Sequence, residues 1–111
     1  MTVTVELVDI AAIHEEATKA AIEAETAYKV IYGEPFYCGF AWVSIYGIRV
    51  NSKIGKEISK FCKKDYTGAF CVWNPGKTAT QSMAVKEQGA YAYAKVWKAH
   101  GFKAYSASRA D

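Results

Sequence analysis

Residues 36–46 read FYCGFAWVSIY, and the alternation of their side chains decides the fold. One face of this extended stretch carries Phe36, Cys38, Phe40 and Trp42, and the other carries Tyr37, Ala41, Val43 and Ile45. Because both faces are apolar, the pattern predicts a central strand covered on both sides, by helices or by a second copy of the chain. Gly39 predicts a bulge or a close approach by another backbone.

Helices are predicted on either side of this strand. Residues 10–31 repeat apolar side chains at helical spacing after Asp9, a good N-cap, and Gly33 ends the pattern. A second helix is predicted over residues 53–63, and a third from Thr80 or Ser82 to His100. Gly89 lies inside the third helix, where close packing would offset its low helix propensity.

Further strands are predicted at residues 2–7, 69–73 and 102–107. The resulting order is (β)αβαβαβ, which predicts an α+β fold. We expect a compact two-layer sandwich in which three main helices pack on a three- to four-stranded mixed sheet, because helices that link strands favour parallel crossovers.

Length and composition predict one domain over residues 1–111. The chain has 51% hydrophobic residues, enough for a self-supporting core, and no apolar run approaches the length of a bilayer. The first ten residues lack the features of a secretory signal, and we expect a cytoplasmic protein. The three cysteines lack regular spacing, so we expect free thiols, and no metal site or cofactor is predicted.

The charges are divided unevenly along the chain. Residues 1–34 contain seven acids and two bases, whereas residues 35–111 contain four acids and twelve bases. This asymmetry indicates either an acidic face that meets a basic face in an assembly or a basic surface for an anion. Two solvated faces that never meet are the alternative.

A basic stripe is the first candidate site. It is predicted along one face of the second helix and its flanks, where it would contact a nucleic-acid backbone or simply be solvated. No aromatic residues are interleaved with it, which argues against base stacking there. Its members are Arg49, Lys53, Lys56, Lys60, Lys63 and Lys64.

A pocket is the second candidate site, chosen by proximity of segments and by chemistry. Its predicted members are Cys38, Trp42, Lys53, Asn74, Lys77, Gln81, Lys86 and Arg109. The tail suggests a related cleft, where Ser106, Ser108, Arg109 and Asp111 would meet Lys86 and Glu87; a plain edge strand is the alternative. No catalytic residue is assigned.

Residues 71–78, CVWNPGKT, resemble a phosphate-binding loop only in part. The first glycine of that motif is replaced by Cys71, and Pro75 removes an amide donor, so an ordinary turn is the simpler interpretation. Lys77 and Thr78 keep the potential to hold an anion at a helix N-terminus. We expect buried structural thiols at Cys38 and Cys71, and surface or capping roles for His14 and His100, rather than a nucleophile pair.

Several segments resemble a family of small uncharacterised proteins of tailed phages and their bacterial hosts. These segments are CGFAWV (38–43), NSKIGK (51–56), WNP (73–75), KEQGA (86–90) and GFKAYSASRAD (101–111). The resemblance implies a phage-type origin and expression in a bacterial cytoplasm. It implies no activity, cofactor or catalytic residue.

Three functions remain open on the sequence. The leading hypothesis is a small accessory or binding protein, not an enzyme, that forms a homo-oligomer. The second is a nucleic-acid accessory protein that uses the basic stripe, and the third is a small ligand-binding protein or enzyme that uses the pocket. No membrane partner is expected.

Overall fold

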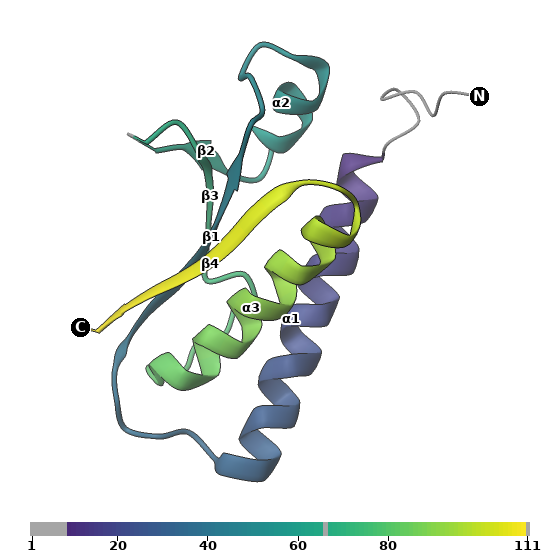
Figure 1. Ribbon diagram of the computed structural model, residues 1–111. Coiled ribbons are helices and arrows are strands. Elements are labelled where there is room, and N and C mark those ends of the chain that lie inside the picture. Colours follow the sequence, from purple (N-terminus) through teal and green to yellow (C-terminus); the bar gives the residue numbers. More distant parts are fainter. Residues whose placement is uncertain (1–8, 66, 111) are drawn as a thin grey trace.

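The computed structural model describes residues 9–65 and 67–110 (Figure 1). It confirms the α+β class: three helices pack on a four-stranded sheet. The strand predicted at residues 2–7 lies outside the described residues. In chain order the elements are α1 (Ile10–Tyr32), β1 (Gly39–Tyr46), α2 (Lys53–Ile58), β2 (Lys63–Lys64), β3 (Phe70–Trp73), α3 (Met83–Ala99) and β4 (Lys103–Ala110).

The sheet is antiparallel throughout, so the mixed sheet that the sequence predicts is wrong. The strand order is β2-β3-β1-β4, and each neighbouring pair is antiparallel. The crossover through α3 does bring β4 back in the direction of β3, but β1 lies between these two strands and opposes both. The sequence also gives no sign of β2, which pairs with β3 across a tight turn. Asp65 closes that turn, because its carboxylate accepts hydrogen bonds from the amides of Thr67 and Ala69.

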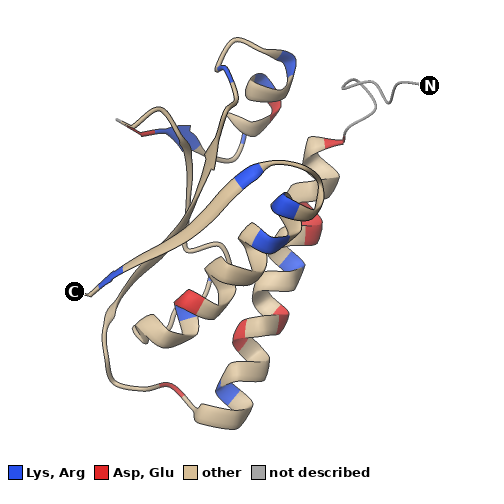
Figure 2. Ribbon diagram, in the orientation of Figure 1, with Lys and Arg blue, Asp and Glu red and all other residues tan. Residues whose placement is uncertain are grey.

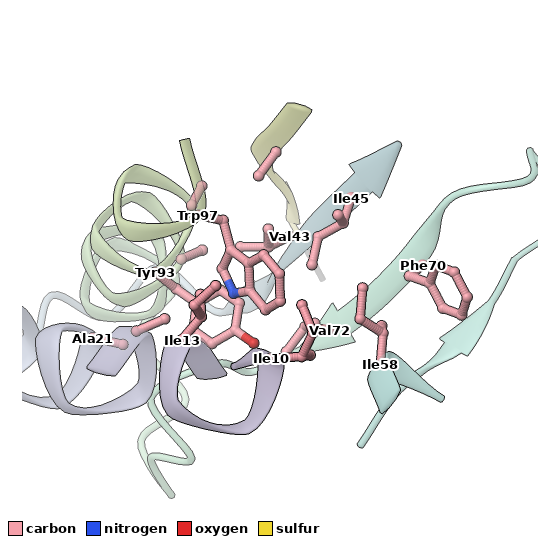
Figure 3. Close-up of a cluster of buried hydrophobic side chains, with 14 of the residues drawn as sticks. Ile10, Ile13, Ala21, Val43, Ile45, Ile58, Phe70, Val72, Tyr93 and Trp97 are labelled. Carbon is pink, nitrogen blue, oxygen red and sulfur yellow. The ribbon is translucent and has the colours of Figure 1, made fainter. Parts of the chain in front are cut away.

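Helices α1 and α3 form the second layer and cover one face of the sheet (Figure 1). The core lies between the layers, where Tyr93 and Trp97 of α3 contact apolar side chains of β1 and β3 (Figure 3). Ala17 and Ala21 on α1 are fully buried, and these small side chains let α1 lie close to α3. The two helices therefore act as one layer, with α3 nearer the sheet.

The caps of the helices follow the sequence. Asp9 begins α1, where its side chain accepts a hydrogen bond from the Ala12 amide at 3.0 Å. Ser52 caps α2 in the same way, at 3.0 Å from the Gly55 amide. Gly33 follows α1 with a φ of +71°, a backbone conformation that favours glycine.

The second helix is shorter than residues 53–63, because the chain leaves the helical path after Ile58. Three-residue turns follow, with the Lys60 amide bonded to the Glu57 carbonyl, and the chain then enters β2. At the other end of the molecule, β4 continues beyond the predicted residues 102–107, and it pairs with β1 along eight residues.

Strand β1 lies in the middle of the sheet, as predicted, but only one of its faces is covered within the chain. Ala41, Val43 and Ile45 face the helices and are buried. The opposite face is open, and Phe36, which precedes the strand, is fully exposed. The expectation of cover on both faces is therefore wrong for a single chain. Gly39 confirms the close backbone approach, because a Cβ there would collide with the Arg109 carbonyl and with Met83.

No helix among the described residues combines the length and the apolar character that a membrane crossing demands.

Candidate functional site

The open face of the sheet carries most of the exposed aromatic surface of the strands. Opposed residues of antiparallel strands share a face, so the register with β1 assigns each side chain to a side. We call this surface the open sheet face. It consists of Phe40, Trp42, Ser44 and Tyr46 of β1, Cys71 and Trp73 of β3, Lys63 of β2, and Lys103, Tyr105, Ala107 and Arg109 of β4.

Aromatic side chains run across three strands of this face. Trp73 is 56% exposed and lies with its ring centroid 4.9 Å from that of Trp42 and 6.4 Å from that of Phe40. Tyr105 is 53% exposed, and its ring centroid lies 5.9 Å from that of Tyr46. Neighbouring rings hold each of these side chains in place, while part of the flat apolar ring surface stays exposed. A further planar group can stack on such a surface.

Cations border these rings. The Arg109 guanidinium lies 5.9 Å from the Phe40 ring centroid, and the Lys86 ammonium lies 5.4 Å from the same centroid. At the other end of β4, the Lys98 ammonium lies 5.3 Å from the Tyr105 ring centroid. The strand residues themselves, Gly39–Tyr46, Lys63–Lys64, Phe70–Trp73 and Lys103–Ala110, include no aspartate or glutamate. The charged side chains that the strands contribute to the open sheet face are therefore all cationic.

The acidic residues lie mainly on the other side of the molecule. Those of the first 34 positions that the structure describes are concentrated on α1, which packs on α3 rather than on the sheet (Figure 2). The helical layer thus separates them from the open sheet face. The uneven charge distribution in the sequence becomes a division between α1 and the sheet strands, while α3 carries Lys86, Lys95 and Lys98 beside Glu87.

A cavity of about 520 Å³ extends the open sheet face at its β3 end. Trp73, Cys71, Lys60 and Lys63 line it together with residues of the turn after α2. Cys62 also lines it, but burial raises the pKa of this thiol to about 12, and burial also raises the pKa of Cys71. Neither cysteine is a thiolate near neutral pH, which argues against nucleophilic chemistry at this cavity.

The predicted basic stripe does not form one helical face. Only Lys53 and Lys56 lie on α2, Arg49 precedes the helix, and Lys60 follows it. Lys63 and Lys64 are neighbours in β2, so they point to opposite faces of the sheet. The stripe fails because α2 ends at Ile58. Only Lys60 and Lys63 line the cavity beside Trp73, whereas the Lys64 ammonium lies 5.5 Å from the ring centroid of the buried Phe70.

Most of the predicted pocket residues gather around the start of β1. Cys38 forms an isolated bridge with Ser82, and the Gly39 amide donates to the carbonyl of Gln81. The buried thiol expected at Cys38 is wrong, because this residue precedes β1 and is exposed. The Lys86 ammonium donates to the Gly39 carbonyl at 3.0 Å.

Arg109 and Trp42 belong to the same end of the open sheet face, and the backbone N–H of Asn74 donates a hydrogen bond to the Ala41 carbonyl. Two predicted members lie elsewhere. Lys77 lines a groove beside α1, and Lys53 is at the far end of β1.

The turn at residues 71–78 is not a phosphate loop. Phe70–Trp73 is a strand, Asn74 and Lys77 adopt positive φ values of 47° and 54°, and α3 begins only at Met83. The extended segment between Lys77 and α3 separates Lys77 from the helix N-terminus, so the two do not form a joint anion site.

The predicted cleft near the tail exists in part. A cavity of about 370 Å³ between α3 and β4 is lined by Glu87, Ser106 and Ser108, and the Ser108 hydroxyl donates to the Glu87 carboxylate. Arg109 points to the opposite face of β4, and Lys86 is buried near Gly39. Asp111 lies outside the described residues.

The two histidines differ. His100 ends α3, as predicted, and contacts Glu16 at 3.1 Å. His14 is half-buried: its ring stacks on Phe61 at 3.9 Å between centroids, and Nδ1 lies 2.7 Å from the Tyr93 hydroxyl. Burial lowers the pKa of His14, and nearby Lys77 lowers it further.

Glu25 is a buried charged group that the sequence does not reveal. It is 3% exposed, and its carboxylate is held between Gly76 and Gly89, so that a Cβ at either glycine would collide with it. Burial raises the pKa of Glu25 to about 7, an effect that Lys29 and Lys86 oppose. No described residue hydrogen-bonds Oε2. No metal-binding group of three His, Cys, Asp or Glu side chains occurs in the described ranges.

The residues that sequence reasoning missed are Trp73, Tyr46 and Tyr105. Their signal is the period-two alternation of the strands, which places each on the same face as Trp42 once the pairing is known. The strand register, which requires the structure, was the missing information. Searches against family models, curated proteins and solved structures match nothing to this chain.

Proposed function

We propose that this protein is a non-enzymatic accessory protein that binds single-stranded nucleic acid across its open sheet face. The observation that carries the proposal is the combination of exposed aromatic rings with cations and no strand acid on one side of a four-stranded antiparallel sheet. Unpaired bases stack on aromatic side chains while basic side chains contact the phosphates.

The geometry suits an extended single strand better than a duplex. A sheet face offers flat rings that reach bases only when the bases are unstacked from a helix, whereas the major groove of duplex DNA admits a helix or a two-stranded ribbon. The exposed rings of Trp73 and Tyr105 lie on strands on either side of β1. A single strand that crosses the sheet would meet both rings in turn.

The cations extend the path of the phosphates beyond the rings. Lys63 and Lys60 line the cavity beside Trp73, and Lys103 and Arg109 lie at the two ends of β4. Part of the basic stripe thus joins the proposed site, whereas Arg49, Lys53 and Lys56 lie around α2 and outside it.

Self-association remains a proposal, but the open sheet face is a poor place for it. If a second copy covered this face with its own, the cations of both copies would be brought together without opposing strand carboxylates. Like charges that face one another across an interface cost several kcal/mol. A polyanion is therefore the better occupant of the face.

The test is binding of fluorescently labelled single-stranded DNA and RNA, measured by anisotropy at several salt concentrations. We expect Trp73→Ala to weaken binding about tenfold, because stacking contributes about 1–3 kcal/mol per base. Tyr32→Ala is the matched control, since Tyr32 is 65% exposed but lies on α1. Absence of binding at low salt, or equal loss in both variants, would refute the proposal.

The setting of this function is also proposed. The resemblance to small proteins of tailed phages supports a phage-type accessory role in a bacterial cytoplasm. The ligands there would be single-stranded intermediates of DNA and RNA metabolism. An equal affinity for every polyanion would count against such a role.

A further inference from the structure

Within residues 9–65 and 67–110, no strand pairs with the outer edge of β4. Strand β4 ends the sheet order, and among the described residues only β1 pairs with it. It is eight residues long and contains no proline, and it carries no charge between Lys103 and Arg109. The backbone N–H and C=O groups along such an edge are a template for another strand.

We propose that β4 pairs with β4 of a second copy of this chain, antiparallel, about a two-fold axis that passes beside Ala107. The two four-stranded sheets then form one sheet of eight strands. This interface uses the edge of the sheet and leaves the open sheet face uncovered, so it does not require the proposed binding of nucleic acid.

The alternation of side chains restricts the register. Opposed residues must share a face for the two sheets to continue into one another. Registers that place an open-face residue opposite a helix-facing residue are therefore excluded. The two registers that use most of the strand then place either Ser106 or Ala107 opposite its own copy. Arg109 and Lys103 lie on the open sheet face together with Ala107.

Charge selects between these two registers. With Ser106 at the centre, Lys103 of each copy faces Arg109 of the other, which places like charges opposite one another twice. With Ala107 at the centre, Arg109 of each copy faces Tyr105 of the other, a pairing in which a guanidinium meets an aromatic ring. The register centred on Ala107 is therefore favoured.

The helix-facing side of the pair is compatible with the same register. Ser106 of each copy faces Ser108 of the other, and both side chains line the cavity of about 370 Å³ under β4. Tyr91, which is 59% exposed, lines this cavity too and would be covered by the second copy. Small and polar side chains at the edge leave room for the close approach of two strands.

The opposite edge of the sheet explains why the assembly stops at two copies. Strand β2 is only two residues long, and both residues are exposed lysines, Lys63 and Lys64. Short edges with lysine resist further pairing. The strands that the structure describes therefore offer one long edge for pairing, which gives a closed dimer and not a filament.

The first test measures mass by sedimentation over a range of concentrations. The wild type is expected to be a dimer, and both Ala107→Lys and Ala107→Glu are expected to raise the dimer dissociation constant roughly tenfold or more, because each places like charges opposite one another. An equimolar mixture of the two variants should recover the dimer, since a lysine then faces a glutamate. Ala107 is exposed, so both variants should keep the unfolding temperature of the wild-type monomer.

The second test is disulfide cross-linking, in a Cys38→Ser background because Cys38 is exposed. Ala107→Cys should cross-link faster than its neighbour Ser106→Cys, because only position 107 faces itself. A wild type that stays monomeric at the highest concentration reached would overturn the proposal, as would a dimer that survives Ala107→Lys. Faster cross-linking of Ser106→Cys would overturn the register.

Discussion

At the scale of single residues, Glu25 makes stability depend on pH. Its carboxyl group has an ordinary pKa of 4.5, and burial raises it to about 7 in the folded chain. The folded state therefore binds the proton more tightly than the unfolded state, and the free energy of unfolding falls as the pH rises from about 4.5 to about 7. Above about pH 7, the stabilisation that protonation of Glu25 provides is fully lost.

Glu25→Gln should remove this loss because the amide carries no charge at any pH. We expect the variant and the wild type to have similar free energies of unfolding at low pH. Above neutral pH the variant should be more stable, by as much as about 3 kcal/mol. Urea unfolding at both pH values measures the difference. The lowered pKa of His14 affects the free energy of unfolding of both proteins equally, so its contribution cancels in the comparison. A constant difference between the two proteins at all pH values would contradict the expectation.

Lys63 supports a second prediction at this scale. If it contacts a phosphate of a bound single strand, Lys63→Gln should reduce the slope of log K against log salt by about 0.7. Lys19→Gln on α1 is the control, because this lysine lies on the helical layer and should leave the slope unchanged. Equal slopes for Lys63→Gln and the wild type would remove Lys63 from the proposed site.

At the scale of elements, the contact of α1 with α3 depends on Gly89. A Cβ at this position would collide with the Glu25 carboxylate, which cannot withdraw because Gly76 blocks its other side. Gly89→Ala should therefore destabilise the protein by about 1–3 kcal/mol, although alanine is the better helix former. In a Glu25→Ala background the same change should stabilise it by up to about 1 kcal/mol. Thermal or urea unfolding of the four proteins tests the reversal of sign, and an equal effect in both backgrounds would refute it.

The sequence predicts the elements that have local signals and misses those that depend on pairing. The Asp9 and Ser52 caps, and close packing at Gly89, follow from residue chemistry and are confirmed. The end of α2 and the existence of β2 are missed, because Lys63 becomes a strand residue only through its pairing with β3. Glu25 is missed for a related reason. The apolar spacing of residues 10–31 places Ala24 on the inner side of α1, but its neighbour Glu25 is the buried residue because Gly76 and Gly89 leave room for its carboxylate.

At the scale of the whole molecule, the acids of α1 and the bases of the sheet strands lie on different elements. Acids concentrate on α1, while the sheet strands contain only bases among their charged residues (Figure 2). The uneven charge distribution along the sequence predicts a basic surface, but not the position of that surface or its aromatic residues. The position required the strand order, which assigns Trp42, Trp73 and Tyr105 to one open face.

This arrangement predicts a difference between polyanions. Contacts with phosphates weaken as salt rises because counterions are released on binding, whereas stacking on rings is much less sensitive to salt. We therefore expect unlabelled single-stranded DNA to displace a bound labelled strand far better than inorganic polyphosphate of the same charge. The advantage should increase with salt concentration and should be largely lost in Trp73→Ala. If polyphosphate competes equally well at every salt concentration, the open sheet face is only a cationic patch, and its exposed tryptophan and tyrosine rings require another explanation.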